Sequence, residues 1–139
     1  MTAPFGDSEL LAGFRAATLP EGAFRHREHV RVAWLMLREL PPDRALEAFS
    51  TGLRRYAAAC GKAGLYHETI TWAFLLLIRE RMARGAPDTT FAEFAAANPE
   101  LLAWKPSILE SYYRPETLAS DLARRVFLLP DRLELRPSE

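Results

Sequence analysis

The sequence has one cysteine, no long hydrophobic run and no excess charge of either sign. Cys60 alone cannot form an internal disulfide, which is typical of a protein kept in a reducing cytoplasm, where a small buried side chain is its ordinary role. The longest apolar run, residues 72–78, is far shorter than the ~20 residues that span a bilayer. Residues 1–10 lack the apolar core of a signal peptide. We therefore expect a cytoplasmic protein with no membrane partner.

Lys plus Arg and Asp plus Glu both number 18, so the formal net charge is zero. Nucleic-acid-binding proteins usually present a net basic face, so this balance argues against a nucleic-acid partner. Hydrophobic residues make up 49% of the chain and charged residues 26%, as is ordinary for soluble globular proteins. A chain of 139 residues is long enough to bury a core. We expect a single helical domain over residues 1–139, with residues 132–139 as an extended tail.

The sequence also lacks the alternating pattern of a β-strand, which only residues 133–135 show, over too short a stretch. Apolar residues recur instead at helical spacing. This spacing predicts an all-α fold, a bundle of four longer helices closed by smaller ones. Thr90 and Glu93 form a capping box for a short fifth helix, and Pro115 opens a last helix that runs to residue 127. The four longer helices are expected over residues 7–18, 26–40, 42–60 and 67–84.

The three histidines fall into two short clusters, each at the start of an apolar helix. His26 and His29 are three residues apart, so their rings lie on the same side of a helix. His67 and Glu68 precede the fourth helix. If the two helix starts meet at one cavity, the three imidazoles either bind a divalent metal (zinc, iron, manganese or nickel) or bind substrate directly. Glu68 then acts as a further ligand or as a base on metal-bound water.

Each of these residues also has an ordinary structural explanation. His26 can lie in solvent at a helix N-terminus, His29 can bond to a backbone carbonyl, and His67 can cap the fourth helix through a ring nitrogen. The H-x-x-H spacing also arises by chance, so it is weak evidence for a metal. Without a metal, His67 and Glu68 can still act as general acid and base. Two helix N-termini at one cavity would favour an anionic substrate group.

Four further residues are candidate substrate contacts. Thr71 follows His67 by one helical turn, and Arg114 lies in an irregular stretch where a guanidinium can hold a carboxylate or phosphate. Tyr66 and Tyr113 would add hydroxyl groups. Alternatively, Thr71 bonds back to its own helix, Tyr113 and its neighbour Tyr112 pack at the core edge, and Arg114 forms a surface ion pair. The tryptophans are expected in the core, where they can also wall an apolar pocket: Trp34, Trp72 and Trp104.

The motif F-x-H-x-x-H, followed by an apolar helix and then by Y-H-E-T-x-T, resembles an uncharacterised family of small bacterial helical proteins. The stretch at residues 112–118, Y-Y-R-P-E-T-L, is similar to the same family, so the resemblance covers residues 24–135. The resemblance implies that His26, His29, His67 and Glu68 belong to one shared pattern. It implies no particular reaction.

These observations lead to two main hypotheses. The first is a small cytoplasmic enzyme that acts on a small polar or anionic metabolite by His/Glu acid–base chemistry, with or without a metal. Hydrolysis, elimination or isomerisation would suit such groups. The second is a non-enzymatic helical module that binds a small molecule or a metal with the same residues. A further alternative is a structural subunit of a homodimer, with the histidines merely at helix ends.

Overall fold

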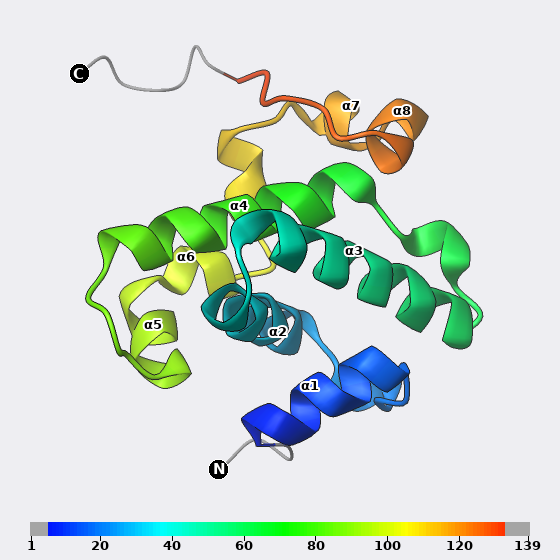
Figure 1. Ribbon diagram of the computed structural model, residues 1–139. Helices are drawn as coiled ribbons and strands as arrows, with labels where there is room; N and C mark the ends of the chain where they lie inside the picture. The colour runs from blue at the N-terminus through cyan, green and yellow to red at the C-terminus, as the bar shows by residue number, and fades with distance from the viewer. Residues whose placement is uncertain (1–5, 133–139) are drawn as a thin grey trace.

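The computed structural model describes residues 6–132, which form helices and connecting loops (Figure 1). No strand occurs within these residues, so the all-α prediction is confirmed. The longer helices are α1 (Asp7–Ala16), α2 (His26–Glu39), α3 (Pro42–Ala59), α4 (Glu68–Arg84) and α5 (Phe91–Ala97). The shorter elements are α6 (Pro99–Leu102), α7 (Pro115–Leu118), α8 (Asp121–Arg125) and the 3-10 turns η1 (Glu21–Ala23), η2 (Ala63–Leu65) and η3 (Ile108–Ser111).

Local sequence signals set several helix ends. Pro42 occupies the first turn of α3, where its missing N–H breaks no helical hydrogen bond. The chain leaves α3 through Gly61, whose positive φ of 72° a glycine adopts without the strain that a Cβ would bring. The predicted capping box at α5 is present: the backbone N–H of Glu93 donates to Thr90 Oγ1 over 3.1 Å, and that of Thr90 donates to Glu93 Oε1 over 2.8 Å.

The expected last helix over residues 115–127 is wrong, because the chain forms two short helices there, α7 and α8. Ser120 separates them: its hydroxyl donates to the Thr117 carbonyl over 2.7 Å and accepts from the Ala123 N–H over 3.1 Å. A serine that caps the following helix in this way ends the preceding one. The expected tail lies outside the described residues except for Arg132, and so do residues 133–135.

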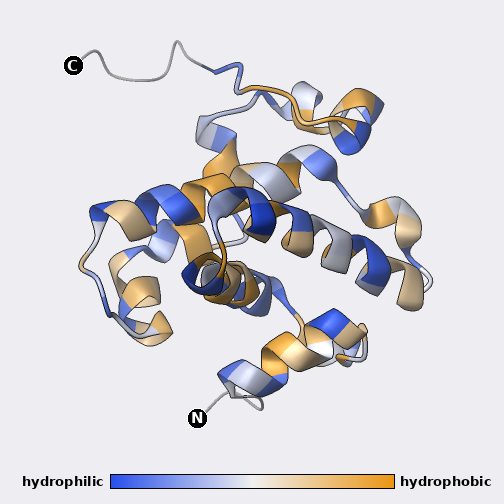
Figure 2. Ribbon diagram, viewed as in Figure 1, coloured by the Kyte–Doolittle hydropathy of each residue, from blue (hydrophilic) through white to orange (hydrophobic). Residues whose placement is uncertain are grey.

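Helix α4 lies at the centre of the molecule, between α2 and α3 on one side and α8 on the other (Figure 1). Its middle is apolar and its C-terminal part is hydrophilic (Figure 2). Burying one large aliphatic or aromatic side chain contributes roughly 1.5–3 kcal/mol, so this central segment is a main source of stability. Its buried apolar side chains are Ala73, Phe74, Leu75 and Ile78.

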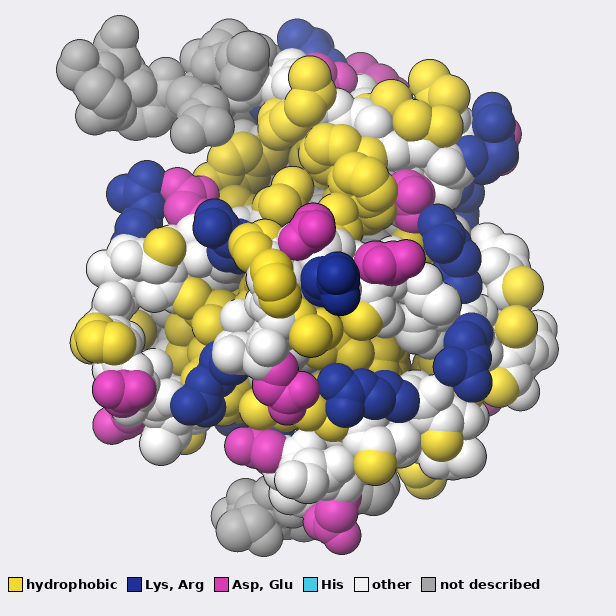
Figure 3. Space-filling view, viewed as in Figure 1, with side chains coloured by type: hydrophobic (Ala, Val, Ile, Leu, Met, Phe, Trp, Pro, Cys, Tyr) yellow, Lys and Arg dark blue, Asp and Glu magenta, His cyan; other side chains and the backbone are white. Residues whose placement is uncertain are grey.

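The surface has no single dominant charge on the face shown in Figure 3, where basic and acidic side chains are interspersed and no histidine is visible. Apolar side chains gather in the upper part of this view. Leu122 in α8, and Val126 and Leu129 after it, are exposed apolar residues. Among the described residues, no helix combines the length and apolar character needed to cross a membrane.

Gly52 provides a test of the packing between α1 and α3. A Cβ at this position would lie 2.3 Å from Cε2 of Phe14, whose side chain is fully buried and therefore cannot move aside easily. We expect Gly52→Ala to lower the free energy of unfolding by about 1–3 kcal/mol, although alanine favours a helix. Urea denaturation measures this change. Gly64→Ala, where an added Cβ meets nothing within 4 Å, is the matched control and should change stability by less than about 0.5 kcal/mol.

Candidate functional site

A cavity of about 340 Å³ is lined by side chains of α2, α3 and α4, of the segments that precede α2 and α4, and of Trp104. This volume is at the small end of the ~300–1,000 Å³ that is common for small-molecule sites. Buried apolar side chains form its inner wall: Val30, Phe49, Phe74 and Ile78. His26, His29 and His67 all line this cavity, but their rings are used in different ways.

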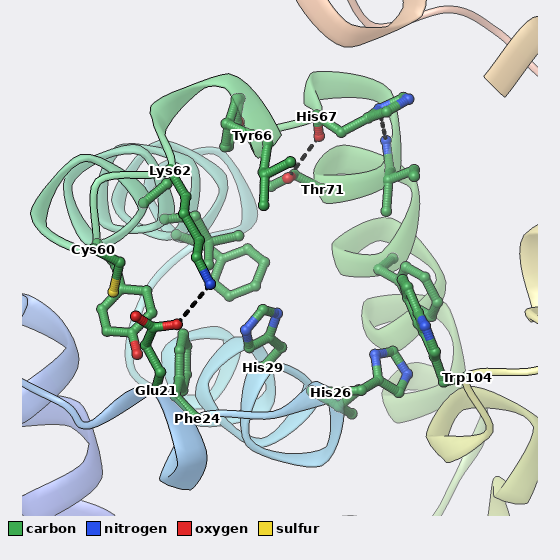
Figure 4. A pocket seen from close by; sticks show the side chains of 18 of the residues that line it. Glu21, Phe24, His26, His29, Cys60, Lys62, Tyr66, His67, Thr71 and Trp104 are labelled. Carbon is green, nitrogen blue, oxygen red and sulfur yellow. Dashed lines mark hydrogen bonds and ion pairs between the residues drawn. The ribbon is translucent and has the colours of Figure 1, made fainter. Parts of the chain in front are cut away.

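The ring of His67 is fully engaged by backbone groups. Its Nδ1 accepts from the Ile70 N–H over 3.1 Å, which caps α4, and its Nε2 lies 2.8 Å from the Leu118 carbonyl. Because Nδ1 accepts, Nε2 carries the proton and donates to Leu118. In Figure 4 the ring points away from His26 and His29. The structure therefore gives His67 the capping role that the sequence left open as an alternative.

His26 is held at the side of the cavity. Its Nε2 lies 2.8 Å from the Leu101 carbonyl, and its ring packs 5.1 Å from Trp104 and 5.0 Å from Phe74. Burial lowers the pKa of His26, and the bond to Leu101 opposes this effect. Trp104, expected in the core, is instead 53% exposed and lines the cavity next to this ring.

His29 differs from the other two histidines because its ring makes no hydrogen bond to any residue in the range 6–132. The ring packs against Phe24 with 4.2 Å between centroids and points into the cavity (Figure 4). Burial, with a smaller contribution from His26, lowers the pKa of His29 to about 4. The imidazole is therefore neutral at pH 7 and offers one donor and one acceptor.

The described part of the chain contains no group of three or more His, Cys, Asp or Glu side chains placed to hold a metal ion. Both ring nitrogens of His67 bond to backbone atoms, so this residue does not join His26 and His29 as a ligand. The residues present therefore do not fit the predicted centre for zinc, iron, manganese or nickel.

Glu68 is not among the residues that line the cavity. Its Oε1 accepts from the Tyr66 hydroxyl over 2.6 Å and pairs with Arg54 over 2.9 Å. Burial and then this bond to Glu68 raise the pKa of Tyr66, which keeps the phenol protonated. The expected acid–base pair of His67 and Glu68 is therefore not assembled, because each side chain is bonded elsewhere.

The four expected substrate contacts divide into two pairs. Tyr66 and Thr71 line the cavity, although the Thr71 hydroxyl donates to the His67 carbonyl over 2.8 Å, which is the alternative role considered for it. Tyr113 and Arg114 do not line the cavity. The buried Tyr113 hydroxyl donates to the Leu128 carbonyl over 2.7 Å, and the Arg114 backbone N–H donates to Asp131 over 2.8 Å.

Tyr56 is a cavity residue that the sequence reasoning did not select. Its hydroxyl is buried and has no hydrogen-bond partner among the described residues, and its ring lies 4.8 Å from that of Phe24. Burial, followed by the neighbouring Cys60 and Glu21, raises the pKa of Tyr56 to about 12. Its position could have identified it from the sequence. Tyr56 lies on the apolar face of α3 with Phe49 and Leu53, and its hydroxyl is the polar side-chain group among these three residues.

Among residues 6–132, the charged side chains that line the cavity are Glu21 and Lys62, which form an ion pair with 2.7 Å between Oε1 and Nζ (Figure 4). Both side chains are more than half exposed, as is Leu65, so this part of the lining is at the opening. Cys60, expected to be buried, is only partly buried and also lines the cavity. The two charges offset each other and leave the cavity without a net charge.

Comparisons with protein-family models, with curated proteins and with solved structures found no match. The functional argument therefore depends on the cavity itself, and the resemblance to a bacterial family stays a prediction.

The double role of His67 predicts a loss of stability when its ring is removed. His67→Ala deletes the cap of α4 and leaves the Leu118 carbonyl without its donor, so we expect the free energy of unfolding to fall by about 2–3 kcal/mol. His67→Asn keeps a capping side chain but is too short to reach Leu118, so about half of this loss should remain. Urea denaturation at pH 7.5 measures both. Unchanged stability in His67→Ala would contradict the structural role.

The low pKa of His29 predicts a loss of stability in acid. Between pH 6.5 and about 4 the unfolded chain binds a proton on His29 and the folded protein does not, so stability falls as the pH decreases through this range. The contribution is about 3 kcal/mol when complete. Urea denaturation at several pH values between 7 and 4 measures this effect. The free energy of unfolding should fall more steeply with decreasing pH for the native protein than for His29→Gln. An equal pH dependence of the free energy of unfolding in the two proteins would show that His29 titrates normally in the folded protein.

Proposed function

We propose that the protein binds a small, uncharged and largely apolar molecule in the cavity between α2, α3 and α4. The unpaired imidazole of His29 is the observation that carries this proposal. Buried polar groups in proteins nearly always have a hydrogen-bond partner. The His29 imidazole is half-buried, faces the cavity and bonds to no described residue, so it leaves a hydrogen-bond position that a ligand in the cavity can take.

The lining of the cavity favours a neutral ligand over the polar or anionic metabolite expected from the sequence. Its inner wall is apolar, and its two charged residues, Glu21 and Lys62, already neutralise each other. Moving an unpaired charge out of water costs several kcal/mol. The described part of the lining holds no further cation to offset that cost for a carboxylate or phosphate.

An acid–base enzyme remains the second candidate, because the cavity holds the imidazoles of both His26 and His29. A general base works best when its pKa lies near the working pH, whereas burial lowers the pKa of both residues. Among the described residues, the carboxylate of the lining, Glu21, is paired with Lys62, and Glu68 is bonded outside the cavity. These features support a binding role more strongly than hydrolysis, elimination or isomerisation.

Two neighbouring alanines on α3 allow a matched test. Ala57 lines the cavity, whereas Ala58 is exposed and does not. With the neutral fluorescent probe N-phenyl-1-naphthylamine, we expect saturable one-to-one binding to the native protein and to Ala58→Phe. Ala57→Phe should bind at least about tenfold more weakly, because the added ring occupies the cavity. Absence of saturable binding to the native protein, or equal affinity in Ala57→Phe, would overturn the proposal.

A further inference from the structure

We propose that the ligand is a neutral hydrogen-bond donor, an O–H or N–H group on a compact apolar body, and that this group donates to the free Nδ1 of His26. The inference rests on the binding function proposed above and names the chemical class of the ligand. It makes His26 the residue that determines specificity, and it disfavours ligands whose only polar atom is a hydrogen-bond acceptor.

The tertiary structure fixes the tautomer of His26. Its Nε2 lies 2.8 Å from the Leu101 carbonyl oxygen, which can only accept a hydrogen bond, so Nε2 carries the ring proton. Because burial lowers the pKa of His26, the ring is neutral at pH 7. Nδ1 therefore has a lone pair and no proton, and it can accept a hydrogen bond but cannot donate one.

This Nδ1 is free and accessible. No described residue bonds to it. In the described part of the chain, the side-chain atoms that lack both a partner and accessible surface are Tyr56 Oη and Trp72 Nε1, so Nδ1 of His26 keeps some surface. His26 lines the cavity, and Figure 4 shows one nitrogen of its ring on the side that faces the cavity. A ligand in the cavity can therefore reach the lone pair.

The His26 ring is also held in one orientation. Its centroid lies 5.1 Å from that of Trp104 and 5.0 Å from that of Phe74, and the bond to Leu101 holds its far edge. A binding group that is already ordered loses little conformational entropy when a ligand binds. The lone pair therefore has a set direction, which favours a ligand that carries its donor at one particular position.

The inner hydroxyl and imidazole donors of the cavity are already used by protein acceptors. The Tyr66 hydroxyl donates to Glu68 over 2.6 Å, and the Thr71 hydroxyl donates to the His67 carbonyl over 2.8 Å. The proton on His67 Nε2 is shared with the Leu118 carbonyl, also over 2.8 Å. These side chains have no proton left for a ligand that needs a donor.

The remaining side-chain donors of the described lining are poorly placed or weak. Lys62 and Trp104 are both 53% exposed, so their N–H groups lie at the opening, where water can bond to them. The Tyr56 hydroxyl has no accessible surface, and the thiol of Cys60 is a weak donor. His29 can present either a donor or an acceptor, so it does not exclude a donor ligand. The balance of the lining favours a ligand that donates.

Isothermal titration of the native protein with two sets of matched probes tests the inference. Indole, benzofuran and indene share one shape and differ at one ring position, which is N–H, O or CH₂. 4-Ethylphenol and 4-ethyltoluene differ in the same way, by a hydroxyl in place of a methyl group. We expect each donor probe to bind about tenfold more tightly than its isosteres without a donor. Benzofuran should resemble indene, because its oxygen can only accept.

Long-range ¹H–¹⁵N spectra of the native protein observe the acceptor directly. The ¹⁵N resonance of His26 Nδ1 should move upfield when indole binds, because a donated hydrogen bond shields an unprotonated ring nitrogen, and it should move less with indene. Nδ1 of His67 is the internal control. It has the same tautomer and already accepts from the Ile70 N–H, so its resonance should stay in place with both probes.

Two variants assign the preference to one imidazole. His26→Phe keeps an aromatic ring between Trp104 and Phe74 and removes the acceptor, so the ratio of the indole and indene affinities should fall from about ten to about one. In His29→Leu the ratio should stay near ten. The spectra use the native protein, so they decide the question even if His26→Phe does not fold.

The outcomes separate this inference from the binding function on which it rests. Equal affinities for indole and indene, a tighter benzofuran, or an unmoved His26 Nδ1 resonance in the indole complex would overturn the donor inference and leave the binding site in place. A preference lost in His29→Leu but kept in His26→Phe would also overturn it. So would failure of all five probes with N-phenyl-1-naphthylamine still bound. Failure of every probe, including N-phenyl-1-naphthylamine, would overturn the binding function itself.

Discussion

The need to pair buried polar groups governs how this chain is held together. At the start of α4, Thr69 is fully buried, and its hydroxyl donates to the Val126 carbonyl over 2.8 Å and accepts from the Leu128 N–H over 3.1 Å. The His67 ring bonds both to its own helix and to Leu118. An unpaired buried group would cost about 1–3 kcal/mol, so these bonds fix the end of α7 and the segment after α8 against α4.

The cavity is where this rule is broken within the described residues. The His29 ring faces it without a bond to any described residue, although the neighbouring Thr71 hydroxyl is paired. The Tyr56 hydroxyl is also unpaired among the described residues, but it has no surface open to the cavity. A further exception, the indole N–H of Trp72, lies outside the cavity, where its ring stacks on Phe127.

Sequence patterns predicted the helices better than the site. The apolar spacing, Pro42, and the capping box of Thr90 and Glu93 are local signals, and the helices begin where these signals place them. The last predicted helix failed because Ser120 bonds both backward and forward, which the apolar pattern does not reveal. At the site, the clustering of histidines directed attention to the right cavity but not to the bonds of each ring.

The sequence alone determined the all-α class, most helix ends and the presence of histidines at the starts of α2 and α4, because these depend on residues a few positions apart. Only the tertiary structure decided which imidazole is available. His26 bonds to Leu101 and His67 bonds to Leu118, partners 75 and 51 residues away, and His29 meets no such carbonyl. A side chain's hydrogen-bond partners depend on where distant backbone comes to lie, and that position is set by the packing of the whole chain.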